Sequence, residues 1–70
     1  MTRDFNVIIE RDRAGYYVAT VPGLRGCHTQ AKSLDELMER VEEAIGLCLE
    51  VEGADEELDF VGVQKVKVAV

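Results

Sequence analysis

The chain has 70 residues, a net charge of −6, two cysteines and 47% hydrophobic residues. This length provides one small hydrophobic core, so we expect residues 1–70 to form a single domain that gains stability from self-association. The sequence contains no apolar run that could cross a membrane and no signal-peptide pattern. We therefore expect a cytoplasmic protein in which both cysteines are reduced.

Acidic residues are concentrated in the second half of the chain. Residues 33–59 contain eleven acidic side chains and one base, a net charge of −10, whereas the remainder of the chain carries +4. Such an acidic segment repels phosphate backbones and attracts basic proteins. The bases outside it are scattered, without the interleaved aromatic residues that are typical of nucleic-acid-binding surfaces. We therefore predict a basic protein partner and no direct binding to nucleic acid.

The first half of the chain is predicted to form strands. Residues 5–10 alternate between two faces, which is the pattern of a half-buried strand. Residues 12–15 have turn chemistry, and residues 16–21 are rich in aromatic and β-branched side chains, so the two strands form a hairpin. Pro22–Gly23 ends the second strand, and a short third strand is predicted over residues 27–30.

A helix is predicted to begin at Leu34. Ser33 stands three residues before Glu36, the spacing of a capping box at a helix start. Gly53 suits a left-handed cap residue, so the helix should end near Val51, after about five turns. At about 100° per residue the apolar positions form one stripe. The stripe consists of Leu34, Leu37, Met38, Val41, Ala44, Ile45, Cys48 and Leu49.

Alternation returns at residues 65–70, where valine alternates with lysine or alanine, and predicts a fourth strand. The element order β-β-β-α-β predicts an α+β fold, a mixed four-stranded sheet with one helix on one face. The other face carries Ile8, Tyr16 and Val18 among polar neighbours. One helix cannot cover both faces, so we predict that a second subunit covers this face in a homodimer or larger oligomer.

Two further features are candidate determinants of partner binding. The loop over residues 22–28 combines a rigid turn with Leu24, which we expect to be exposed, and with Arg25 and His28. Leu47 projects from the polar side of the helix, where it gains nothing from the core. The acidic helix face adds Glu36, Glu39 and Glu43. In the simpler interpretation the loop only connects two strands, and the charges only keep a small domain soluble.

The residues that could carry chemistry do not form a recognisable site. Cys27, His28 and Cys48 are zinc-ligand types, but neighbours on a strand point to opposite faces and Cys48 lies in the apolar stripe. Nucleophilic catalysis would need a nucleophile and an orienting carboxylate beside a base, and neither can be identified for the single histidine, His28. Glu10 and Asp12 leave a weak metal-dependent nuclease as a minor hypothesis. We expect no metal, no cofactor and no catalytic residue.

Three stretches carry a resemblance to a known family. They are residues 15–30, which contain Pro22-Gly23-Leu24-Arg25-Gly26-Cys27-His28-Thr29, then Ser33-Leu34-Asp35-Glu36, and later Glu43-Ala44-Ile45. Together they resemble the HicB antitoxin family over about residues 5–52, and the combination is more specific than any one piece. The resemblance implies a truncated ribonuclease H-like domain of order β-β-β-α-β.

The resemblance also implies a function. HicB domains sequester a small basic HicA toxin that cleaves messenger RNA, and the acidic helix fits such a partner. Many members of the family continue into a DNA-binding segment, whereas this sequence ends after the fourth predicted strand, so we expect no C-terminal DNA-binding segment. The alternatives are an orphan structural or regulatory oligomer without a toxin and the weak nuclease.

Overall fold

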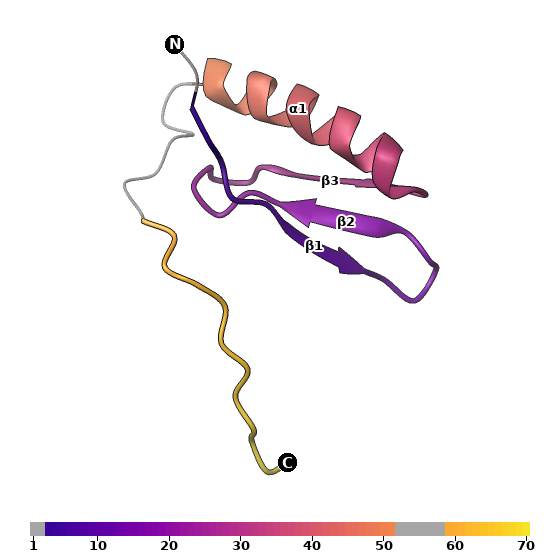
Figure 1. Ribbon diagram of the computed structural model, residues 1–70, viewed down its shortest axis with the longest axis vertical. Coiled ribbons are helices and arrows are strands. Elements are labelled where there is room, and N and C mark those ends of the chain that lie inside the picture. Colours follow the sequence, from indigo (N-terminus) through magenta and orange to yellow (C-terminus); the bar gives the residue numbers. More distant parts are fainter. Residues whose placement is uncertain (1–2, 52–58) are drawn as a thin grey trace.

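Three short strands and one helix make up the folded body of the protein (Figure 1). The computed structural model describes residues 3–51 and 59–70. The strands form an antiparallel sheet in the order β1-β2-β3. The elements are β1 (Ile8–Arg11), β2 (Tyr17–Thr20), β3 (His28–Ala31) and α1 (Leu34–Glu50). The predicted hairpin, third strand and helix are therefore confirmed, with strands that are shorter than or shifted from the predicted ranges.

Asp12 organises the turn between β1 and β2. Its carboxylate accepts hydrogen bonds from the backbone N–H groups of Ala14 (3.0 Å) and Tyr16 (2.9 Å). Gly15 follows with φ of +90°, a conformation that L side chains rarely adopt. The turn pairs Ile9 with Ala19 across the hairpin, and residues on this face lie on the side of the helix.

The helix begins where the sequence predicts. The Ser33 hydroxyl accepts a hydrogen bond from the backbone N–H of Glu36 (3.2 Å), as the N-cap residue does at a helix start. At the other end Val51 is the C-cap, and its N–H donates to the carbonyl of Cys48 (3.2 Å). Gly53, the predicted left-handed cap, lies outside the described residues.

The core lies between the helix and two of the three strands. α1 packs over β3 and β2 and does not pack over β1. One cluster of buried residues joins the middle of the sheet to the helix, and a second lies at the end where the 22–28 loop closes. The first consists of Ala19, Ala31, Leu37 and Val41, and the second of Val21, Leu24 and Cys27. Because the helix lies to one side, β1 stays largely uncovered.

The fourth strand predicted over residues 65–70 is absent from the sheet. Among the described residues, 59–70 pair with no strand, and the segment runs away from the folded body (Figure 1). All five of its valines are largely exposed, among them Val61 (95%), Val63 (77%), Val66 (72%) and Val68 (68%). The alternation is typical of a strand, but a strand also needs a neighbour to accept its backbone hydrogen bonds, and no described strand pairs with this segment.

Candidate protein-binding site

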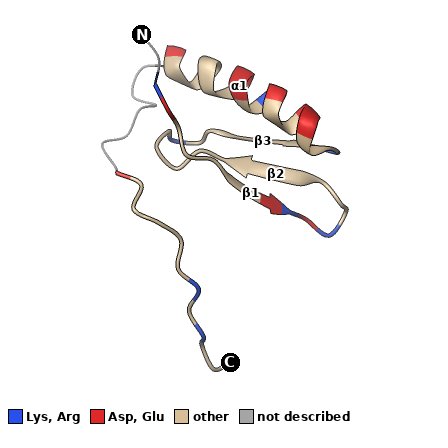
Figure 2. Ribbon diagram, in the orientation of Figure 1, with Lys and Arg blue, Asp and Glu red and all other residues tan. Residues whose placement is uncertain are grey.

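The outer face of α1 carries a concentration of negative charge. Figure 2 shows acidic residues along the helix, with a single basic residue among them. Glu39 and Glu43 are exposed, and the last turn of the helix contains no base. Leu47 is 65% exposed, as predicted from its position on the polar side. This face therefore offers carboxylates and one large apolar side chain to a partner.

Glu36 differs from the other predicted acidic residues because it is engaged within the chain. Its carboxylate lies 2.6 Å from the guanidinium of Arg40, one helical turn along α1. Arg40 also donates a hydrogen bond to the backbone carbonyl of Gln30 in β3 (2.8 Å). The pair thus links the helix to the outer strand of the sheet, and binding a cationic partner through Glu36 would compete with Arg40.

The expectation that Leu24 is exposed is wrong, because its side chain is only 2% exposed. The 22–28 loop closes on itself: Leu24 N–H donates to the carbonyl of Val21 (3.1 Å), and Cys27 N–H donates to the carbonyl of Leu24 (3.2 Å). These bonds turn the leucine inward against the C-terminal half of α1. A leucine between a Pro-Gly turn and a Gly-Cys pair gives no periodic signal, so the sequence did not reveal this packing.

Arg25 and His28, the polar residues of the same loop, are exposed. Gly26 adopts φ of +66°, and its carbonyl lies 3.1 Å from Nδ1 of His28. The loop packs against Ala44 and Cys48 in the C-terminal half of α1, whereas Glu36 is in the first turn of the helix. The residues predicted to bind a partner therefore fall into two regions. One region is the 22–28 loop together with the C-terminal half of α1, and the other is the N-terminal half of α1.

The cysteines lie together at the same end of the molecule. Cys27 is buried, Cys48 is half-buried, and both are free thiols. Burial, followed by a hydrogen bond and a Coulombic contribution from the Cys48 thiol, raises the pKa of Cys27 to about 11. A thiol with a raised pKa is a poor nucleophile at neutral pH. Within residues 3–51 and 59–70, no three His, Cys, Asp or Glu side chains gather as metal ligands would.

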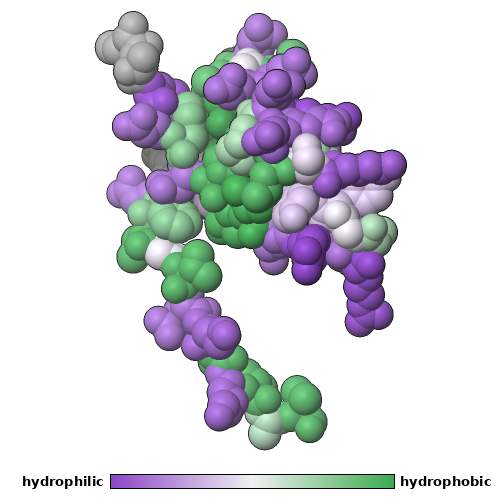
Figure 3. Space-filling view, turned by 45° about the vertical axis from the view of Figure 1, so that its right-hand side comes forward, coloured by the Kyte–Doolittle hydropathy of each residue, from purple (hydrophilic) through white to green (hydrophobic). Residues whose placement is uncertain are grey.

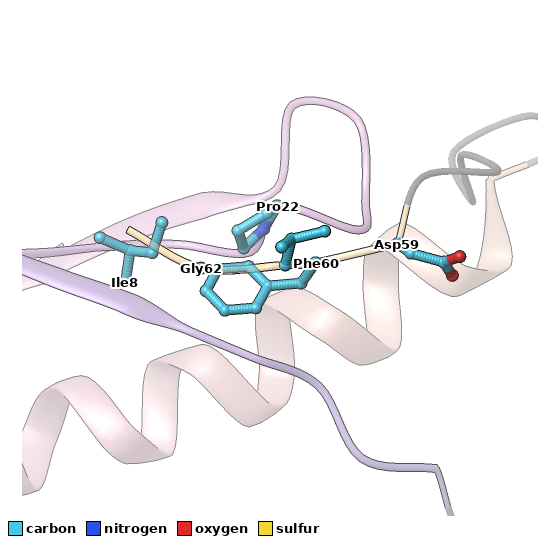
Figure 4. Close-up of a pocket in the computed structure, with 6 residues that line it drawn as sticks. Ile8, Pro22, Asp59, Phe60 and Gly62 are labelled. Carbon is cyan, nitrogen blue, oxygen red and sulfur yellow. The ribbon is translucent and has the colours of Figure 1, made fainter. Parts of the chain in front are cut away.

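The residues predicted to lie at an oligomer interface are half-buried. Ala19 faces the helix, so its neighbour Val18 lies on the opposite face of the sheet. Ile8 lies on this same face, because its partner Thr20 is two residues from Val18. The ammonium group of Lys32 lies 5.8 Å from the centre of the Tyr16 ring. An open hollow of about 340 Å³ is lined by Ile8, Pro22 and residues 59–62, with the Phe60 ring next to Pro22 in the view of Figure 4. Residues 59–62 of the same chain therefore lie near part of this face.

A second apolar surface was not predicted. It consists of Ile9 (43% exposed), Leu34 (48%), Met38 (42%) and Leu49 (41%), and we call it the apolar margin. Arg40 reaches β3 from one side of the buried stripe, so the opposite side of the stripe, with Leu34 and Met38, faces β1. Figure 3 shows hydrophobic surface on the folded body next to polar helix residues. The stripe indicated a core face, but the helix covers only two strands, so part of the stripe is exposed.

Comparison with known proteins identifies the family of the chain. Residues 5–68 match the family described as HicB-like antitoxin of bacterial toxin–antitoxin systems. The chain belongs to the HicB-like antitoxin family. A UPF0150 protein of Archaeoglobus fulgidus is 64% identical over 64 residues, which are 91% of this chain and 93% of that protein. A UPF0150 protein of Synechocystis is 44% identical over 66 residues, 94% of this chain and 96% of its own length.

The range of the family match bears on the exposed segment. The HicB-like domain as matched includes residues 59–68, beyond the 5–52 region that carried the resemblance in the sequence. The segment therefore lies almost entirely within the matched range. No helix in the part of this HicB-like chain that the structure describes is long and apolar enough to cross a membrane.

Proposed function

We propose that this HicB-like domain binds and neutralises a small basic HicA-type toxin that cleaves messenger RNA, by protein–protein contact in the cytoplasm. The observation that carries the proposal is the exposed acidic face of α1, with Glu39 and Glu43 beside the exposed Leu47. A ribonuclease that binds RNA needs a basic surface, and an acidic face of this kind complements it. Membership of the antitoxin family supports the same partner.

Neutralisation then needs no catalysis by this chain. The domain would cover the basic surface through which the toxin approaches RNA, and opposite charges would accelerate their encounter. Leu47 would provide apolar contact within a charged rim, which is how interfaces commonly gain binding energy. Arg25 and His28 extend the proposed surface at the C-terminal end of the helix, because their loop packs there.

The test is a charge reversal on the helix. Glu39→Lys with Glu43→Lys changes the charge by +4 at two exposed positions. We expect affinity for a HicA-type toxin to fall about tenfold or more, because two attractive contacts become repulsive. Isothermal titration calorimetry measures the affinity, and circular dichroism checks that the helix is retained.

The matched control is Asp4→Lys with Asp59→Lys, which makes the same change in charge at exposed positions outside the helix. This control should bind with nearly unchanged affinity, apart from a small long-range effect of net charge. Equal losses in both double variants would mean that only net charge matters, and unchanged affinity in both would remove the acidic helix from the interface.

A regulatory homo-oligomer without a toxin is the second candidate. The apolar margin and the exposed valines of residues 61–68 favour it, because exposed apolar surface beyond scattered single residues often marks a contact with another protein. In this case the protein would self-associate and would bind no small basic protein offered to it. A partial ribonuclease H-like arrangement, with a fourth strand next to the three that are present, is compatible with both candidates.

A further inference from the structure

The outer edge of β1 is the open side of the folded body. β1 pairs only with β2 among the described residues, and α1 does not pack over it. An edge strand offers unpaired backbone donors and acceptors, which proteins usually cover or pair. The other edge strand, β3, lies beneath the helix, and its Gln30 carbonyl already accepts a hydrogen bond from Arg40. β1 is therefore the edge at which a further strand can add.

The same molecule carries a segment with the chemistry of such a strand. Residues 65–70 place Val66, Val68 and Val70 on one side and Lys65, Lys67 and Ala69 on the other, and the three valines are largely exposed. Valines that are exposed in this way lack the apolar burial that would stabilise the segment. The segment thus has an exposed apolar side and pairs with no strand among the described residues, and the hydrogen bond to its backbone is local, from the Gln64 side chain to the Lys65 carbonyl (3.2 Å).

The two faces of β1 match the two sides of this segment. Ile9, which belongs to the apolar margin, lies on the helix-side face of the sheet, whereas Glu10 lies on the opposite face. A strand that places its valines beside Ile9 also places Lys65 and Lys67 on the face of Glu10. A shift by one residue would instead place lysines beside Arg11 and valines beside Glu10. Apolar contact and charge therefore select the same pairing.

The course of the chain indicates which copy supplies the strand. Residues 59–62 line the same hollow as Ile8 and Pro22 (Figure 4), and the rest of the segment runs away from the folded body (Figure 1). A second copy can present its β1 edge to this extended segment, and the exchange is reciprocal in a two-fold dimer. The valines would then lie over the second copy's Ile9 and beneath Leu34 and Met38.

We propose that two copies of this chain exchange residues 63–70, each segment pairing as a fourth strand with β1 of the other copy and covering its apolar margin. The interface differs from the one predicted at Ile8, Tyr16 and Val18, since it lies at the β1 edge and on the helix side. It completes a four-stranded sheet between subunits. The acidic outer face of α1 stays open, so the proposal does not depend on toxin binding.

The decisive experiment asks whether the segment pairs within one chain or between chains. Unlabelled and ¹⁵N-labelled wild-type protein are mixed unfolded, refolded together and treated with a carbodiimide, which joins a lysine to a carboxylate that it contacts. We expect links from Glu10 to Lys65 or Lys67 in which the two peptides carry different labels. If these links occur only between peptides of the same label, the strand adds to its own sheet and the proposal is overturned.

A pair of variants tests the side of the segment that is buried. Val66→Glu with Val68→Glu should convert the dimer to a monomer in sedimentation analysis, with the helix retained by circular dichroism. Ala69→Glu is the matched control on the lysine side of the same segment, and this variant should remain dimeric. A dimeric Val66/Val68 variant, or a wild-type protein that is monomeric at all concentrations, would refute the exchange. Loss of toxin binding with the dimer intact would affect only the proposed function.

Discussion

Replacement of Leu24 by alanine tests whether this residue of the 22–28 loop stabilises the core or serves only in recognition. A core residue contributes to the free energy of unfolding, whereas an exposed recognition residue does not. Leu24 is 2% exposed and packs with Val21 and Cys27 beneath the C-terminal half of α1. Removing a buried leucine side chain to the β-carbon typically costs about 2–5 kcal/mol, depending on how far the cavity collapses. A domain of this size has a free energy of unfolding of about 4–10 kcal/mol. The substitution should therefore remove a large fraction of the stability.

Leu47→Ala is the matched control, because it deletes the same atoms from a leucine that is 65% exposed. Its effect on the free energy of unfolding should stay within about 0.5 kcal/mol. Urea unfolding followed by circular dichroism measures both values, at equal protein concentration because self-association contributes to stability. If Leu24→Ala is as stable as the control, Leu24 is not a core residue and the packing derived for the loop is wrong.

Two further predictions concern single groups. Ser33→Ala removes the hydroxyl that accepts a hydrogen bond from the Glu36 N–H, so the free energy of unfolding measured with urea should fall by about 1 kcal/mol. Ser33→Asp can still cap the helix, so its free energy of unfolding should fall less. Equal losses in the two variants would exclude a capping role for Ser33. Because burial raises the pKa of Cys27 from 9.0 to about 11, its neutral thiol stabilises the fold fully below about pH 9, and this contribution is lost as the pH rises to about 11. Under reducing conditions the free energy of unfolding should fall more steeply across this range in the wild type than in Cys27→Ala; identical slopes would contradict the raised pKa.

The local features were predictable because a few neighbouring residues decide them. Ser33 begins the helix through one hydrogen bond within its own turn, and Asp12 organises the β1–β2 turn through two. Leu47 could be placed on the exposed side because helix periodicity alone sets its direction. Each prediction depends on contacts within about four residues, so the sequence contains all the information that it needs.

The candidate site was predictable only where it lies on the helix. Glu39 and Glu43 are exposed as periodicity indicates, but Glu36 is engaged by Arg40, and this ion pair depends on where Gln30 of β3 lies. Leu24 was misplaced because a loop has no periodicity from which its direction could be derived. Its burial follows from hydrogen bonds that close the loop against the helix.

The sequence by itself determined the type of each element in the folded body, the acidic face of the helix and the alternation of the valines near its end. Only the tertiary structure decided which strands the helix covers and where residues 59–70 run. Periodicity specifies which side of an element is apolar, but burial depends on the position of a neighbouring element across long sequence separations. For this reason the apolar margin and the unpaired segment, which together suggest a second copy, became visible only in three dimensions.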